Sequence, residues 1–187
     1  MRKPAATKEA TMRNPSIERA AELGDNVVTA FEDQDVIRSY GHRPPYAPEV
    51  FAILCELSAG SPRADFDVGC GRGELARPLA AHVKRLDAVD RSAAMIEAGR
   101  AAPRGTTPSL CWIVGQVEDA PLYPPYSLIT GGRSLHWMDW ERILPRFQEL
   151  LLPGGFLAIV NAKPLPLPWR DKLKEIIHPH STDPARR

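Results

Sequence analysis

The chain has 187 residues; 43% of them are apolar, 25% are charged, and the 24 basic side chains nearly balance the 23 acidic ones. This length and composition are typical of one globular domain and exclude a chain that is disordered throughout. The near-zero net charge argues against a nucleic-acid partner bound through a broad basic face.

Helices are predicted before the first strand. Residues 1–15 are polar and are expected to form a flexible arm, whereas residues 16–187 are expected to form one domain. The helical region of this domain covers residues 16–60 and begins with a weak helical pattern over residues 16–38. A second helix is predicted over residues 48–59 because four apolar side chains fall on one face: Val50, Phe51, Leu54 and Leu57.

Residues 61–162 alternate short apolar runs with helical stretches. The predicted strands are 64–68, 86–89, 110–114, 128–130 and 156–160, and the predicted helices between them are 74–83, 93–101 and 140–152. Strands that alternate with helices across short connections are typical of β-α-β units with right-handed crossovers. The sequence therefore predicts an α/β fold with a mostly parallel sheet.

The chain after Val160 predicts little further structure. A proline-rich connection leads to one helix over residues 170–177, so residues 163–187 are expected to be a helix and a tail. No sixth or seventh strand is predicted. The fifth strand would then lie at an unprotected edge of the sheet, which favours pairing with another chain.

A glycine-rich loop follows the first strand directly and opens a helix. Gly69, Gly71 and Gly73 stand at every second position, so the backbone can turn sharply and approach a ligand closely. A dinucleotide loop has the spacing G-x-G-x-x-G, and Glu74 would repel a pyrophosphate at this helix N-terminus. The Lys-Ser/Thr pair of a Walker A loop is also absent. An adenosyl ligand without phosphates fits this loop better.

An acidic residue is expected to close the second strand. Asp90 stands there, 17 residues after Gly73, near the offset of about 20 residues at which acidic side chains bind ribose hydroxyls in open α/β sheets. A carboxylate can accept hydrogen bonds from two neighbouring hydroxyls. The alternative is an Asp that caps the next helix, although Ser92 can take that role.

Five segments in order resemble the class I S-adenosylmethionine-dependent methyltransferases of the type 11 kind, which include trans-aconitate and quinone-biosynthesis methyltransferases. The resemblance extends over about Tyr40 to Ala162, and its segments are DFDVGCGRG, AVDRSAAMIEAGR, VGQVEDAPL, SLITGGRSLHWMDW and LLPGGFLAIV. It implies a Rossmann-like sheet of order 3-2-1-4-5 with helices on both faces, lacking the family's last two strands. It also implies S-adenosylmethionine as cofactor and a small-molecule methyl acceptor.

The resemblance implies a role for each matching residue. Gly69, Gly71 and Gly73 would hold the methionine and ribose parts of the cofactor, Asp67 would orient the loop or bind the methionine ammonium group, and Asp90 would bind the ribose. The adenine would lie among Arg91, Met95, Gln116, Val117 and Glu118.

A lid over the cofactor is expected from the segment before the first core helix. Tyr40, Arg43 and Tyr46 are its candidate residues, and Arg43 could reach the carboxylate of the cofactor. The alternative for Arg43 is a solvated surface arginine.

Methyl transfer from a sulfonium requires approach geometry and sometimes a general base, and no metal site is predicted. His136 follows the fourth strand and is the candidate base; the alternative is a structural histidine that holds the loop. Because the family's last two strands are not predicted in this sequence, two functions stay open. The chain is a methyltransferase, or it is a truncated, non-catalytic module that binds the cofactor or a partner.

Cysteine use and apolar runs indicate the compartment. Cys55, Cys70 and Cys111 are far apart and form no C-x-x-C pair, which is usual in a reducing compartment. Residues 1–20 contain no apolar segment of a secretory signal, and no apolar run is long enough to cross a bilayer. We therefore expect a cytoplasmic protein without a membrane partner.

Overall fold

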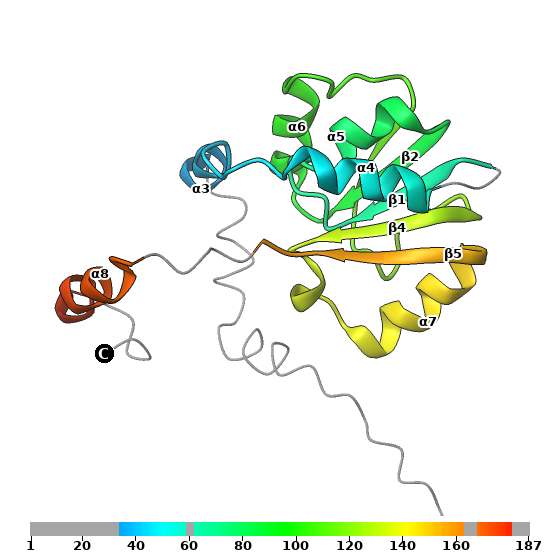
Figure 1. Cartoon of the computed structure of the whole chain (residues 1–187). Coiled ribbons are helices and arrows are strands. Elements are labelled where there is room, and N and C mark those ends of the chain that lie inside the picture. The colour runs from blue at the N-terminus through cyan, green and yellow to red at the C-terminus, as the bar shows by residue number, and fades with distance from the viewer. Residues whose placement is uncertain (1–33, 59–61, 163–167, 181–187) are drawn as a thin grey trace, which may run out of the picture.

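The structure is a computed structural model that describes residues 34–58, 62–162 and 168–180 (Figure 1). Its centre is a five-stranded sheet of order β3-β2-β1-β4-β5, in which every neighbouring pair is parallel. This confirms the predicted fold class and strand order. The expected arm at 1–15 and residues 16–33 lie outside the described residues. The strands are β1 (Ala64–Val68), β2 (Arg85–Asp90), β3 (Leu110–Val114), β4 (Tyr126–Gly132) and β5 (Leu151–Val160).

Helices cover both faces of the sheet (Figure 1). On one face α4 and α5 pack with α6 around Leu54, Leu79 and Ile96, and on the other face α7 packs through Ile143 and Phe147. All five residues of β1 are buried, as expected for a central parallel strand. The helices are α3 (Gln34–Tyr40), α4 (Pro48–Leu57), α5 (Ala76–Leu79), α6 (Ala93–Ala101), α7 (Trp140–Leu150) and α8 (Arg170–Ile177), with short 3₁₀ turns η1 (Ala80–His82), η2 (Leu135–Trp137) and η3 (His178–His180).

Several elements differ from their predicted bounds: the strands expected at 86–89 and 128–130 extend over 85–90 and 126–132, and the helices expected at 48–59 and 140–152 end at Leu57 and Leu150. Two larger differences have a local cause. The helix expected at 74–83 is reduced to α5 and η1, because the turn with left-handed backbone extends through Gly73 and delays the first helical residue. The strand expected at 156–160 begins earlier, at Leu151. Gly154, with φ +82°, allows a bulge there, so that β5 regains its register with β4 at Phe156.

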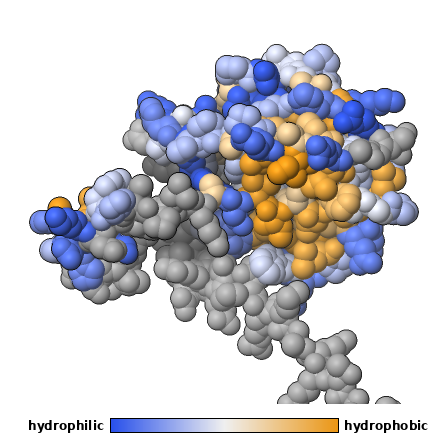
Figure 2. Space-filling model, viewed as in Figure 1, coloured by the Kyte–Doolittle hydropathy of each residue, from blue (hydrophilic) through white to orange (hydrophobic). Residues whose placement is uncertain are grey.

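One edge of the sheet is formed by β5, and the other by β3. Phe156 and Ile159 of β5 are 49% and 56% exposed, and an apolar patch lies on the face that carries β5 (Figure 2). Helix α8 lies away from this edge (Figure 1), and residues 163–167 are outside the described ranges. Within those ranges no helix is long and apolar enough to cross a lipid bilayer.

Candidate functional site

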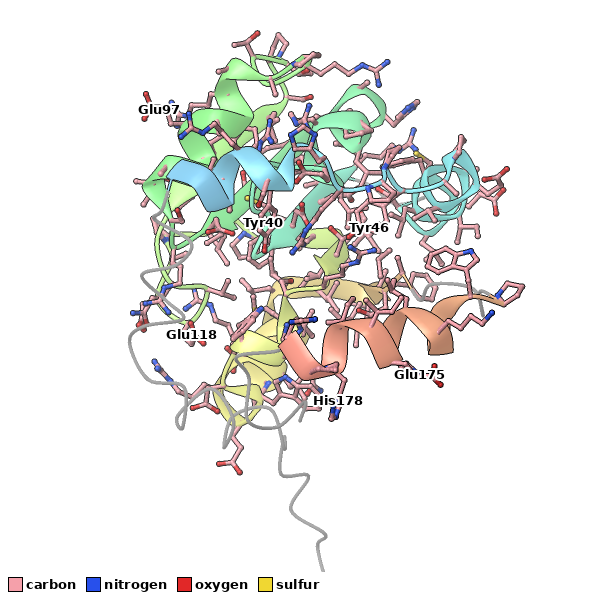
Figure 3. The ribbon with its side chains drawn as sticks, turned by 90° about the vertical axis from the view of Figure 1, so that its left-hand side faces the viewer. Tyr40, Tyr46, Glu97, Glu118, Glu175 and His178 are labelled. Atoms are coloured by element: carbon pink, nitrogen blue, oxygen red, sulfur yellow. The ribbon has the colours of Figure 1, made fainter. Side chains whose placement is uncertain are left out.

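A cavity of about 530 Å³ opens at the carboxyl ends of the central strands. It lies where β1 has β2 on one side and β4 on the other, the point at which the strand order reverses and open α/β sheets bind ligands. Figure 3 looks onto this side of the molecule, with Tyr40 and Tyr46 near the middle of the view. All the predicted cofactor-binding residues except Gly73 line the cavity: Arg43, Asp67, Gly69, Gly71, Asp90, Arg91, Met95, Gln116, Val117 and Glu118.

The three glycines of the loop have left-handed backbone but different surroundings. Their φ angles are +61°, +56° and +76° at Gly69, Gly71 and Gly73. An added Cβ would lie 2.5 Å from Ser134 at Gly69 and 2.5 Å from Trp112 at Gly73, whereas at Gly71 nothing lies closer than 4.0 Å. Gly69 and Gly73 therefore let the loop pack on the protein, and Gly71 leaves space in the cavity itself.

Asp90 fastens this loop to the end of β2. The backbone N–H of Gly71 donates to Asp90 Oδ2 at 2.7 Å, and the N–H of Ser92 donates to Oδ1 at 2.9 Å. Burial raises the pKa of the Asp90 carboxyl, and the two N–H donors oppose that rise. Each oxygen keeps a lone pair, so the carboxylate can still accept hydrogen bonds from ligand hydroxyls.

Asp67 brings a second carboxyl group to the cavity, at the end of β1. It is 2% exposed, and Thr130 Oγ1 donates to its Oδ1 at 2.8 Å. Its other oxygen, Oδ2, is buried without a hydrogen-bond partner among the described residues. Burial raises the pKa of this carboxyl to about 7. An arriving cationic donor would satisfy Oδ2 and favour the ionised form.

The segment expected to form a lid contributes Tyr40, Arg43 and Tyr46 to the wall of the cavity, and Tyr40 and Tyr46 are labelled in Figure 3. The Arg43 guanidinium carbon lies 3.6 Å from the centre of the Tyr40 ring, a cation–π contact. Helix α3 is joined to the glycine loop, because Arg72 Nη1 donates to the carbonyl of Ile37 at 3.5 Å. A Cβ at Gly132 would lie 2.7 Å from the Tyr46 hydroxyl, so that glycine lets Tyr46 reach the end of β4.

The expected adenine-binding residues form another part of the wall. Met95 and Val117 are 2% and 4% exposed, and Glu118 lies at the left side of the view in Figure 3, away from Tyr46. Arg146 of α7 donates to the backbone carbonyls of Glu118 and Ala120. The sequence did not indicate these two hydrogen bonds, because Arg146 donates to backbone groups that are far away in the chain.

The loop after β4 presents different residues from the one predicted. His136 does not line the cavity; it packs on Trp137 with ring centres 4.8 Å apart, and burial lowers the pKa of its imidazole. Its catalytic role stays a prediction. Arg133, Ser134 and Met138 line the cavity, and sequence reasoning missed them. The pair of glycines before Arg133 was the available signal, since it marks a close approach of other groups.

The described residues hold no group of three or more His, Cys, Asp or Glu side chains that could bind a metal ion. The chemistry available in the cavity is that of five carboxyl groups, four arginines and a set of aromatic and apolar side chains.

Comparisons with known proteins agree with this geometry. Residues 66–155 match a family model described as a methyltransferase domain. The trans-aconitate 2-methyltransferase of Methylobacterium radiotolerans is 33% identical over 113 residues, which cover 57% of this chain and 41% of that protein. The chain spans about half the length of the curated relatives it matches, from 41% to 54% for the first three.

Two solved structures show the same fold. A putative type II methyltransferase from Anaeromyxobacter dehalogenans has a TM-score of 0.61 at 26% identity, over 77% of this chain and 61% of that one. A methyltransferase from Thiobacillus denitrificans, solved in complex with S-adenosyl-L-homocysteine, has a TM-score of 0.52 at 20% identity, over 66% and 52% of the two chains.

Proposed function

Because the chain belongs to the class I S-adenosylmethionine-dependent methyltransferases, we propose that it binds S-adenosylmethionine and catalyses methyl transfer to a small organic acceptor. The observation that carries the proposal is the loop with left-handed glycines that is hydrogen-bonded to Asp90 at the point where the strand order reverses. In this loop Gly71 has no side chain, and the space that a Cβ would fill is left open to a ligand.

The residues of the cavity fit the parts of this cofactor. Asp90 has lone pairs for the two ribose hydroxyls. Asp67 Oδ2, buried and without a partner among the described residues, suits the methionine ammonium group. Met95 and Val117 offer apolar surface to the adenine, beside Gln116 and its neighbours.

The chain's own contribution to the reaction is then positioning and exclusion of water. S-adenosylmethionine supplies an activated methyl group, so the protein need only hold an acceptor in line with it. Tyr46, Trp137 and Met138 line the cavity and bring rings and a thioether that limit the access of water. We assign His136 to holding the loop after β4, because it packs on Trp137 and does not line the cavity.

A non-catalytic module that binds only the cofactor is not favoured, since the relatives are methyltransferases. Association of two chains through β5 is a separate proposal. Its support is the exposed apolar side chains of β5, Phe156 and Ile159, at the end of the sheet.

Isothermal titration calorimetry tests the cofactor directly. We expect S-adenosylhomocysteine to bind the purified chain and NAD to give no heat, because the loop lacks the dinucleotide spacing. Binding of NAD with no binding of S-adenosylhomocysteine would overturn the proposal. Methyl transfer is then measured with radiolabelled S-adenosylmethionine and a panel of small organic acids, with trans-aconitate among them because a relative acts on it.

A further inference from the structure

Arg133 has a backbone conformation that arginine rarely adopts. Its φ is +56°, in the left-handed region that costs energy for any residue with a Cβ. The backbone is held there at both sides: the Arg133 N–H donates to the carbonyl of Val160 at 3.1 Å, and Ser134 Oγ donates to the carbonyl of Val68 at 2.6 Å. Conformations fixed against such a cost cluster at functional sites.

The guanidinium of Arg133 has unused hydrogen-bonding capacity. Arg133 lines the cavity, and its Nε is buried with no hydrogen-bond partner among the described residues. Its guanidinium carbon lies 5.9 Å from the centre of the Tyr46 ring. By contrast Arg142, which also lines the cavity, pairs with Asp119 at 3.3 Å, and Arg43 stacks on Tyr40.

The charges around Arg133 indicate which anion suits it. Burial raises the pKa of the Tyr46 hydroxyl; the nearby Arg133 opposes that rise, and the nearby Asp67 adds to it. No ion pair joins Arg133 to Asp67 in the part of the chain that the structure describes. Asp67, Glu74 and Asp90 line the same cavity, together with Arg43, Arg91 and Arg142, so its wall carries both signs of charge and does not favour a doubly charged phosphate. A single carboxylate fits, because its two oxygens match the donor fork of a guanidinium.

We propose that Arg133 binds a carboxylate in this cavity and thereby sets ligand specificity, an inference that rests on the proposed function. The carboxylate can come from two molecules: it is the α-carboxylate of the methionine half of the cofactor, or a carboxylate of the methyl acceptor. Either one would contact the Arg133 guanidinium at the end of β4, and the two experiments below distinguish them.

The first experiment compares two nucleosides by calorimetry. S-adenosylhomocysteine has the amino-acid half, whereas 5′-methylthioadenosine has the same adenosyl group without it. If the carboxylate belongs to the cofactor, Arg133→Gln weakens S-adenosylhomocysteine binding by about 10- to 100-fold, the range of one charge-assisted hydrogen bond, and leaves methylthioadenosine unchanged. Arg133→Lys, which retains the charge, recovers part of the loss. The matched control is Arg100→Gln, at an exposed arginine of α6 that does not line the cavity, with affinities close to wild type.

The second experiment tests the acceptor as the source. Protein saturated with S-adenosylhomocysteine is titrated with trans-aconitate, succinate and benzoate, and with the corresponding amides. If the carboxylate belongs to the acceptor, the wild type binds at least one acid more tightly than its amide, and Arg133→Gln abolishes that preference while retaining S-adenosylhomocysteine affinity.

The inference is overturned if folded Arg133→Gln, checked by circular dichroism, matches the wild type for S-adenosylhomocysteine and for every acid. A wild type that binds neither nucleoside overturns the proposed function, and this inference with it. The two failures are therefore distinguishable.

Discussion

Gly71 and Gly154 form a matched pair for testing the glycine loop. Both have left-handed backbone, with φ +56° and +82°, and an added Cβ would meet nothing closer than 4.0 Å at either position. Only Gly71 lines the cavity. We expect Gly71→Ala and Gly154→Ala each to lower the free energy of unfolding by about 1–2 kcal/mol. S-adenosylhomocysteine affinity should fall only in Gly71→Ala, because its methyl group lies in ligand space; equal affinities in calorimetry would contradict the assignment.

Asp67 should make both stability and cofactor binding depend on pH. The ordinary pKa of this carboxyl is 3.8 and burial raises it to about 7 in the folded chain. The folded state therefore holds an extra proton between these values, and its stability falls as pH rises from 4 to 7, by about 4 kcal/mol at most. Asp67→Asn should remove this dependence of the free energy of unfolding on pH. Urea denaturation at several pH values measures it.

Asp65→Asn is the control for that experiment. Burial raises the pKa of Asp65 to about 6, although Ser58 donates to it at 2.7 Å, and Asp65 does not line the cavity. Replacement of Asp65 by Asn should also make the free energy of unfolding depend less on pH. S-adenosylhomocysteine affinity should rise as pH increases through 7 in the wild type and in Asp65→Asn. That rise should disappear in Asp67→Asn, and a rise that persists there would contradict the role of Asp67 toward the ammonium group.

The site was predictable where its residues follow one another in the chain. The glycine loop and Asp90 stand directly after their strands, and parallel strands bring their carboxyl ends to one edge. Arg133 and Tyr46 were not predicted as neighbours, because their contact depends on a segment before β1 reaching the end of β4. The exclusion of His136 from the cavity likewise follows from how η2 turns, which the sequence pattern does not indicate.

Among the elements, local signals decided which bounds were predictable. Helix α6 begins where predicted because Ser92 Oγ accepts from the N–H of Met95 at 3.2 Å, a side-chain cap visible in the sequence. The start of β5 was predicted too late, since Pro153, Gly154 and Gly155 are typical of a chain break. The pairing of β5 with β4 nevertheless continues across these three residues through a bulge. The bulge depends on the position of β4, which the local sequence of β5 does not indicate.

Tyr126 should stabilise the sheet by joining β4 to β2 across the central strand. Its hydroxyl donates to Asp87 Oδ2 at 2.5 Å, and both residues are completely buried. Burial and the Asp87 contact raise the pKa of Tyr126. Tyr126→Phe removes this hydrogen bond. Among the described residues the buried carboxyl then keeps Arg85, whose Nε is 3.4 Å away, so we expect a loss of about 1–3 kcal/mol in the free energy of unfolding.

Urea denaturation measures that loss, with Tyr123→Phe as the control because Tyr123 is 62% exposed. The control should stay within about 0.5 kcal/mol of wild type. Neither variant should change S-adenosylhomocysteine affinity, because neither tyrosine lines the cavity. Equal stability of the two variants would show that the hydroxyl of Tyr126 contributes nothing.

At the scale of the whole molecule, we expect the edge at β5 to govern association between chains. Exposed apolar edge strands recruit other chains, and Phe156 and Ile159 give this edge its apolar character. We expect the average mass in light scattering to rise with protein concentration. Ile159→Lys should suppress the rise, because charged side chains protect edges, whereas Ile176→Lys on α8, at a 64% exposed position, should not. A wild type that stays monomeric at every concentration would contradict the proposal.

The bulge in β5 offers a practical use. Gly154 has open space around it, and β5 already absorbs additional residues there, between its pairings with Tyr126 and Leu128 at the amino ends of the strands. The cavity lies at the other end of the strands, where their carboxyl ends meet. A short epitope or a fluorophore-bearing peptide inserted at this point should therefore label the protein and leave ligand titrations undisturbed.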